Sequence, residues 1–182
     1  MREKLERGAR VADVGCGHGA SAIVLADAFP NSTFIGFDAH EDSIDIARER
    51  ASEAGVEANL HFEVARADEY EEGDFDLICF MDCLHDMGDP QGASAHVLKS
   101  LKPDGTWMIV EPLANDKLEE NCNPVGRMYY SASTTICTPA PRSQEVGGAR
   151  GNQTRETRLR VSVIGDGCDQ CLLGTEDILH TL

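Results

Sequence analysis

The sequence has few basic residues and no long apolar run. Its 182 residues include 16 Lys and Arg against 32 Asp and Glu, which gives a formal net charge of −16 at pH 7. A surface of that sign repels a phosphate backbone and argues against DNA or RNA as the main partner. No apolar run approaches the roughly 20 residues that cross a bilayer, and the N-terminal MREKLERGAR has no apolar signal core. We therefore expect a cytoplasmic protein that binds neither nucleic acid nor membranes.

Aromatic side chains are also scarce, at 5% of the chain, and none follows Tyr130. The hydrophobic fraction of 41% still suffices for the core of one domain. We expect the core in residues 1–113 and a partly irregular C-terminal extension of the same domain in residues 114–182. Within the extension, Arg158–Ile164 alternates like an edge strand. The final CDQCLLGTEDILHTL resembles no closing strand and is compatible with a short helix.

Seven cysteines without a secretion signal predict free thiols rather than a disulfide framework. The one close pair, Cys168 and Cys171, has the spacing of half a zinc site or of a redox pair. The nearest further candidates, Cys122, Cys137 and His180, do not form a second pair at matching spacing. We therefore expect no metal site.

Apolar runs and helical patterns alternate along the first two thirds of the chain. The near-continuous apolar run Phe75–Met81 is typical of a parallel strand covered by helices on both faces. Periodicity and stop signals predict strands at Arg10–Val14, Thr33–Phe37, Leu60–Val64, Phe75–Met81 and Thr106–Val110, a turn at Lys102–Gly105, and helices at Ala20–Phe29, Glu41–Ala54, Pro90–Leu101 and Pro124–Ala132. This order predicts an open, doubly wound α/β sheet.

Glycines and an acidic residue gather where the first predicted strand ends. Ligands of such sheets bind at the carboxyl ends of the strands. Gly15, Gly17 and Gly19 let a ligand approach the backbone N–H groups at the start of the next helix. Asp13 would repel a pyrophosphate there, but it suits a ligand that carries an amino group and a sulfonium.

Two further acidic residues follow the next two strands. Asp38 comes 19 residues after Gly19, where a carboxylate can accept from both hydroxyls of a ribose. Asp68 follows the third strand and can accept from an adenine amino group. Each acid alone is explained equally well as a helix cap or a turn residue. Together with Asp13 and the glycine turn, they indicate a nucleoside with a cationic tail.

Five motifs between residues 10 and about 112 resemble, in order and spacing, those of class I S-adenosylmethionine-dependent methyltransferases. They are VADVGCGHGA, FIGFDAH, Ala67-Asp68, FDLICFMDCLHDMGD and LKPDGTWMIVEP. The resemblance implies S-adenosyl-L-methionine as the cofactor. It also implies a mostly parallel, seven-stranded Rossmann-like sheet of order 3-2-1-4-5-7-6, with the seventh strand antiparallel. By this resemblance the cofactor-binding residues are Asp13, Gly15, Gly17, Gly19, Asp38, Ala39, Asp68 and Asp82.

The segment Leu84–Asp89, LHDMGD, is similar to the L-H-D-W-x-D stretch of small-molecule O-methyltransferases in that family. The resemblance assigns His85 the role of general base on the acceptor hydroxyl, with Met87 in place of the usual Trp. The residues give independent support, because His85 follows a predicted strand beside Asp82 and Asp86, and a neutral imidazole can take the proton of a phenol or alcohol. The structural alternative is a histidine that caps a helix or bonds a loop carbonyl.

The acceptor and the partners are predicted less directly. Tyr129 and Tyr130 lie in a predicted helix where these folds usually cover a small-molecule acceptor, although packing explains them equally well. Related methyltransferases often carry an N-terminal dimerisation domain, so we expect either a homodimer or a separate domain of that kind. The alternatives to a small-molecule O-methyltransferase are an inactive cofactor-binding module and, less favoured, an NAD-dependent oxidoreductase.

Overall fold

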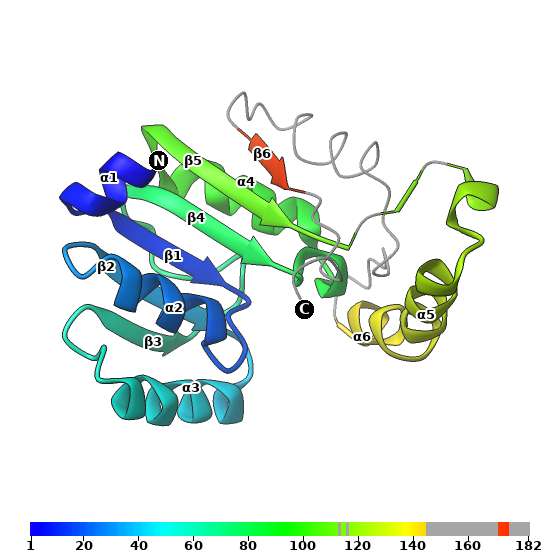
Figure 1. The fold of residues 1–182 in the computed structure, drawn as a ribbon, viewed down its shortest axis with the longest axis horizontal. Helices are drawn as coiled ribbons and strands as arrows, with labels where there is room; N and C mark the ends of the chain where they lie inside the picture. Colours follow the sequence, from blue (N-terminus) through cyan, green and yellow to red (C-terminus); the bar gives the residue numbers. More distant parts are fainter. Residues whose placement is uncertain (113, 116, 145–170, 175–182) are drawn as a thin grey trace.

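A parallel sheet with helices on both faces forms the centre of the molecule (Figure 1). The computed structural model describes residues 1–112, 114–115, 117–144 and 171–174. The strands are β1 (Arg10–Val14), β2 (Thr33–Asp38), β3 (Leu60–Val64), β4 (Phe75–Met81), β5 (Leu101–Val110) and β6 (Cys171–Gly174). Their order is β3-β2-β1-β4-β5-β6, and every pairing is parallel. The prediction of a doubly wound α/β fold is confirmed.

The helices follow the strands much as the sequence predicts. They are α1 (Arg2–Arg7), α2 (Ala20–Ala28), α3 (Glu41–Ala54), α4 (Pro90–Ser100), α5 (Pro124–Ala132) and α6 (Pro139–Arg142), with short turns of helix η1 (Leu84–Asp86), η2 (Leu118–Asn121) and η3 (Ser133–Cys137), the last of π type. The helix α3 ends at Gly55, whose positive φ of 71° is the left-handed conformation that glycine favours. At the start of α4, the Asp89 carboxylate accepts from Gly92 N–H at 2.9 Å.

Two apolar clusters cover the two faces of the sheet. The neighbours Val11 and Ala12 in β1 are fully buried but belong to different clusters, because successive side chains of a strand point to opposite faces. The cluster around Val11 includes Ile44 of α3, and the cluster around Ala12 includes Val97 of α4 and Trp107 of β5. Both clusters hold the strands in register, so the strand ends lie at one edge.

The structure differs from the prediction near β5. The strand begins at Leu101, so the predicted turn Lys102–Gly105 is part of the strand. Phe75 of β4 pairs with Leu101, but Leu77, two residues later, pairs with Thr106, so the register shifts between them. This irregularity absorbs the extra residues that the sequence assigned to a turn.

The edge of the sheet also differs from the prediction. The described residues form six strands, and β6 lies beside β5 in parallel orientation, where the resemblance implied an antiparallel strand. The segment Cys171–Gly174, for which a short helix was an option, is a strand. The predicted edge strand Arg158–Ile164 and the residue Cys168 lie outside the described residues.

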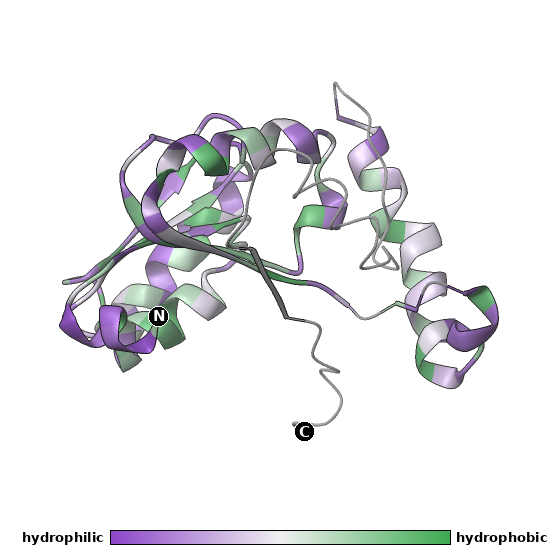
Figure 2. Ribbon diagram, turned by 90° about the horizontal axis from the view of Figure 1, so that it is seen from above, coloured by the Kyte–Doolittle hydropathy of each residue, from purple (hydrophilic) through white to green (hydrophobic). Residues whose placement is uncertain are grey.

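The helices α5 and α6 lie beyond the carboxyl ends of the strands (Figure 2). Gln144, just after α6, ties this region to η1, because its side chain accepts from Gly88 N–H at 2.7 Å and donates to the Asp86 carbonyl at 2.9 Å. Among the described residues, no helix is long and apolar enough to cross a membrane.

Candidate functional site

A cavity of about 590 Å³ opens at the carboxyl ends of the strands. Its size is typical of small-molecule and cofactor sites. Its lining comes from the glycine turn, from the loops after β2, β3 and β4, and from the segment after α6. The lining residues are Gly15, Asp38, Ala39, His40, Ala65, Arg66, Ala67, Asp68, Asp82, Cys83, Asp86, Met87, Gly88, Asp89 and Gln144. Five aspartates line the cavity, and the basic side chains among its lining residues are Arg66 and His40.

The glycine turn after β1 has the backbone conformation that the sequence predicts. Gly15, Gly17 and Gly19 have φ values of 72°, 52° and 75°, a region that L side chains rarely adopt. A Cβ on Gly15 would lie 2.8 Å from the Cys83 sulfur, and one on Gly19 would lie 2.5 Å from the Phe62 ring. Two of these glycines therefore also serve close packing, and of the three only Gly15 lines the cavity in the described part of the chain.

Asp38 joins the end of β2 to the glycine turn. One carboxylate oxygen accepts from Gly17 N–H at 2.9 Å, and the other accepts from His40 N–H at 2.9 Å. Asp38 and Ala39 both line the cavity. Each carboxylate oxygen can accept more than one hydrogen bond, so these backbone bonds orient Asp38 and leave it able to accept from a ligand.

Asp13 lies behind the turn, and it is not among the described residues that line the cavity. Its side chain is 2% exposed, and burial raises its pKa to about 6 even though Ser21 donates to one of its oxygens. The other oxygen has no hydrogen-bond partner among the residues that the structure describes. Any influence of Asp13 on a ligand is therefore electrostatic and acts through the turn.

Asp68 lines the cavity beside Arg66. The Arg66 guanidinium donates to both Asp68 oxygens, at 3.1 and 3.3 Å, and this bidentate bond holds the pKa of Asp68 below its usual value. Asp68 therefore remains an acceptor across the physiological pH range.

Asp82 lies at the end of β4 with φ at 57°, the one described residue other than glycine with a positive φ. A conformation of this kind costs a side-chain-bearing residue roughly 1–2 kcal/mol, and such residues cluster at functional sites. Burial, aided by the charges of Glu111 and Asp86, raises the pKa of Asp82. The strained backbone holds this carboxylate in the cavity wall.

His85 lies in η1, one layer behind the cavity wall, and its side chain is 3% exposed. Its Nδ1 is hydrogen-bonded to the carboxylate of Glu111, which is equally buried. The same carboxylate accepts from the backbone N–H groups of Leu84 and His85, at 2.8 and 3.3 Å. Glu111 thus fixes both the helical turn and the ring that it carries.

The other ring nitrogen of His85 faces the cavity wall. Nε2 lies 3.4 Å from Oδ1 of Asp86, and the Asp86 side chain lines the cavity. Burial disfavours the charged ring, but the bond to Glu111 and the nearby carboxylates outweigh it and raise the pKa of His85. The predicted base is therefore built into a series of three side chains, Asp86, His85 and Glu111.

The two predicted substrate residues lie away from the cavity. Tyr129 and Tyr130 are both half-buried in α5, and neither is among the described residues that line it. Tyr130 lines a different hollow of about 410 Å³ between η2 and α5. Their predicted contact with an acceptor has no support from this cavity.

Sequence reasoning missed Glu111 and Gln144. Glu111 is an acidic residue directly after β5, much as Asp38 is the acidic last residue of β2, so the strand-end rule applied to the fifth strand would have found it. Gln144 gave no signal, because its bonds to Gly88 and Asp86 span more than fifty residues.

Comparison with known proteins places this geometry in a family. A family model described as a methyltransferase domain matches residues 5–159. A ubiquinone biosynthesis O-methyltransferase from Thiobacillus denitrificans is 31% identical over 125 residues, which are 67% of this chain and 52% of that protein. The chain spans between 24% and 52% of the lengths of the first curated relatives that it matches.

Solved structures share the fold. An O-methyltransferase family protein from Burkholderia thailandensis superposes with a TM-score of 0.70 at 20% identity, over 90% of this chain and 46% of that one. The O-methyltransferase of a polyketide synthase multienzyme from Brevibacillus brevis, in complex with S-adenosyl-L-homocysteine, gives 0.55 at 21% identity, over 60% of this chain and 37% of that one.

The sheet order, the glycine turn and the acidic cavity define a class I methyltransferase, and the cofactor of this class is S-adenosyl-L-methionine. The chain belongs to the methyltransferase domain family. The cavity fits a cationic nucleoside, because Asp38, Asp68 and Asp82 line it while the glycine turn provides a close approach to the backbone. This assignment replaces the NAD-dependent oxidoreductase alternative.

Proposed function

We propose that the protein transfers a methyl group to a hydroxyl oxygen of a small-molecule acceptor, and that the series Asp86, His85 and Glu111 receives the hydroxyl proton. The observation that carries the proposal is the buried pair of His85 and Glu111 behind a carboxylate that lines the cofactor cavity. His85 is the final proton acceptor, as the sequence predicts. Asp86 is the group that contacts the hydroxyl of the methyl acceptor.

The chemistry of the cofactor is simple. Asp38, Asp68, Asp82 and the glycine turn would hold S-adenosylmethionine, which would supply the methyl group to the acceptor oxygen and leave as S-adenosylhomocysteine. The chain's own residues hold the acceptor in line and take up its proton. The proton passes by way of Asp86 to Nε2 of His85.

Glu111 is the positioning residue of this series. It accepts the Nδ1 proton, so the neutral ring presents the lone pair of Nε2 to Asp86. When His85 becomes charged, the Glu111 carboxylate stabilises the imidazolium in a site from which water is excluded. This arrangement explains why two buried titratable groups lie directly behind the cavity.

The relatives support an oxygen acceptor, since the relative from Thiobacillus denitrificans is named as an O-methyltransferase. The chain spans about half the length of this relative or less. As its partner we propose what the family resemblance implies, either a second copy of the chain or a separate N-terminal dimerisation domain. The identity of the acceptor is open to a panel of phenols and alcohols.

The test is methyl transfer from labelled cofactor to this panel by the wild type and by His85→Gln. Proton-transfer catalysis is typically worth 10²–10⁴-fold, so the variant should lose about that factor in kcat and keep its affinity for S-adenosylhomocysteine. The matched control is His61→Gln, because His61 is exposed on β3. Equal turnover by His85→Gln and the wild type would refute the proposed role.

A further inference from the structure

We propose that His85, Asp86 and Cys137 form a binding site for a thiophilic divalent cation, Zn²⁺, and that the bound ion blocks proton transfer. The three ligand atoms are Nε2 of His85, Oδ1 of Asp86 and Sγ of Cys137, from the group whose ligand atoms all lie within 4.8 Å of one another. The proposed binding site depends only on the geometry of these three side chains. The proposed inhibition of proton transfer rests in addition on the proposed function.

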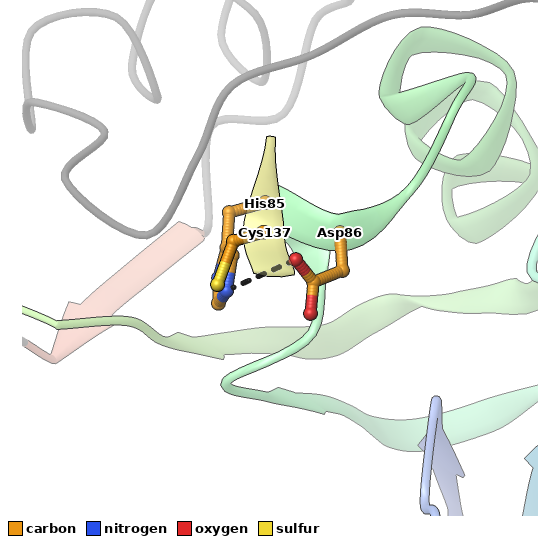
Figure 3. A group of neighbouring side chains, drawn as sticks. All are labelled: His85, Asp86 and Cys137. Carbon is orange, nitrogen blue, oxygen red and sulfur yellow. Dashed lines mark ion pairs between the residues drawn. The ribbon is translucent and has the colours of Figure 1, made fainter. Parts of the chain in front are cut away.

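The cluster joins two segments that are distant in sequence. His85 and Asp86 come from η1 after β4, and Cys137 ends the π-helical turn η3 after α5. Figure 3 shows the Cys137 side chain at the His85 ring and the Asp86 carboxylate next to them, with a dashed line that marks its ion pair with the ring. Single π-helical turns are rare and occur frequently at functional sites. Here the turn brings the cysteine to η1.

The donor set suits zinc. Imidazole nitrogen, thiolate sulfur and carboxylate oxygen are its usual protein ligands, and three of them leave a fourth tetrahedral position for water. A hard cation such as Mg²⁺ would prefer oxygen ligands. His85 and Cys137 are buried, at 2% and 7% exposure, whereas the Asp86 side chain is 40% exposed where it lines the cavity, so an ion bound by all three would lie in the cavity wall and be reachable from the cavity.

Two features of the surroundings prepare the cluster for an ion. Metal-bound histidines almost always donate their other ring N–H to a carboxylate or carbonyl, and Glu111 takes that place on Nδ1. Oδ1 of Asp86 is shielded from solvent and has no hydrogen-bond partner among the described residues. An ion would add a ligand bond to this oxygen, which lies 3.4 Å from Nε2 of His85.

A second group, Asp82, His85 and Glu111, is equally compact but a weaker candidate. It shares His85 and has no sulfur ligand, and its ring nitrogen Nδ1 is bonded to Glu111. The two groups can be told apart by experiment, because only the first requires Cys137 to bind an ion.

The functional consequence follows from the shared atoms. The proposed proton path uses Nε2 of His85 and the carboxylate of Asp86, and both would be ligands of the ion. A lone pair bound to Zn²⁺ cannot accept a proton, so the occupied site and methyl transfer exclude each other. The protein would then be inhibited by zinc at its own proton-accepting group.

Co²⁺ tests the binding site, because a cobalt–thiolate bond gives a charge-transfer absorption band that reports sulfur ligation. The full chain, loaded with one equivalent of Co²⁺, should show this band, and Zn²⁺ should abolish it by displacement. Cys137→Ser should lose the band. Two controls should keep it: Cys122→Ser, which changes an exposed cysteine, and the double variant Cys168→Ser and Cys171→Ser, which removes the only closely spaced pair in the sequence.

A band that survives in Cys137→Ser, or that disappears in the double variant, would overturn the site. S-adenosylhomocysteine binding by each variant verifies that it is folded. If Cys137→Ser does not fold, Glu111→Gln replaces it, with cobalt affinity expected to fall by about 10–100-fold; unchanged affinity would contradict the proposal.

The inhibition of methyl transfer by zinc is measured separately, as the ratio of turnover with saturating Zn²⁺ to turnover without it. The ratio should be below about one tenth in the wild type and close to one in Cys137→Ser. A cobalt band without any methyl transfer in the acceptor panel would count against the proposed function but not against the site. A ratio near one in a wild type that binds zinc would refute the block.

Discussion

The cavity has two halves that are built in different ways. The cofactor half, around Gly15, Asp38 and Asp68, takes its geometry from backbone bonds and from the half-buried guanidinium of Arg66. The proton half, around His85 and Glu111, depends on two titratable side chains that pair in the interior. Both halves need neighbouring strands, β1 and β2 for the Gly17–Asp38 bond and β4 and β5 for the His85–Glu111 pair, but only the second half buries two titratable side chains against each other.

This difference predicts that the proton half is the more fragile one. Glu111→Ala should destabilise the fold by about 3–5 kcal/mol, because it leaves the buried His85 ring and two backbone N–H groups without their acceptor. Denaturant unfolding measures the change. Glu119→Ala, at an exposed position in η2, is the control and should cost less than about 0.5 kcal/mol. If Glu111→Ala lowers the free energy of unfolding by no more than the control does, the proton half is not the more fragile one.

The buried Asp13 should make stability depend on pH. Its folded pKa of about 6 lies above the value of 3.8 for an unpaired side chain, so the folded state binds more protons between these values and stability falls as the pH rises through them. Relative to wild type, Asp13→Asn should become more stable by about 3 kcal/mol between pH 4 and pH 7. Urea unfolding at several pH values measures this. A difference that does not vary with pH would mean that the pKa of the Asp13 carboxyl is not raised in the folded state.

Asp38 tests the cofactor half. Asp38→Ala should weaken S-adenosylhomocysteine binding by about 1.5–3 kcal/mol if the carboxylate bonds the ribose, as charge-assisted hydrogen bonds typically contribute that much. Titration calorimetry gives the affinity, and Asp27→Ala serves as the control for the loss of an acidic charge on the surface. Unchanged affinity would limit Asp38 to fixing the glycine turn through Gly17.

The smallest effect concerns Asp89, which lines the cavity and also caps α4. If it is only a cap, Asp89→Ala should lower stability by about 1 kcal/mol and leave cofactor affinity unchanged. Asp89→Ser, which can still accept from Gly92 N–H, should recover most of that stability. A tenfold loss of cofactor affinity in both variants would instead make Asp89 part of the binding site.

The sequence predicts the cofactor half well because its signals are local. The glycine turn depends on residues within a few positions, and its predicted backbone conformation is confirmed. The strand β5 was predicted too short, since a bulge against β4 absorbs residues that looked like a turn. The parallel pairing of β6 with β5 could not be predicted, because a strand of four residues is too short to give a periodic pattern.

The proton half was predicted only in part, for a physical reason. The sequence identified His85 and its neighbours Asp82 and Asp86, but the pairing with Glu111 spans 26 residues and requires the sheet register. It also placed His85 at the cavity surface, whereas burial puts Asp86 between the ring and the cavity. Tertiary contacts of this kind leave no periodic signal.

The most direct test of the two-part cavity measures both halves in one variant, Glu111→Gln. We expect an affinity for S-adenosylhomocysteine within about twofold of wild type and a single-turnover methyl-transfer rate lower by roughly 10²-fold or more, because only the orientation and stabilisation of His85 are lost. Parallel losses of affinity and rate, or a rate equal to that of wild type, would contradict it.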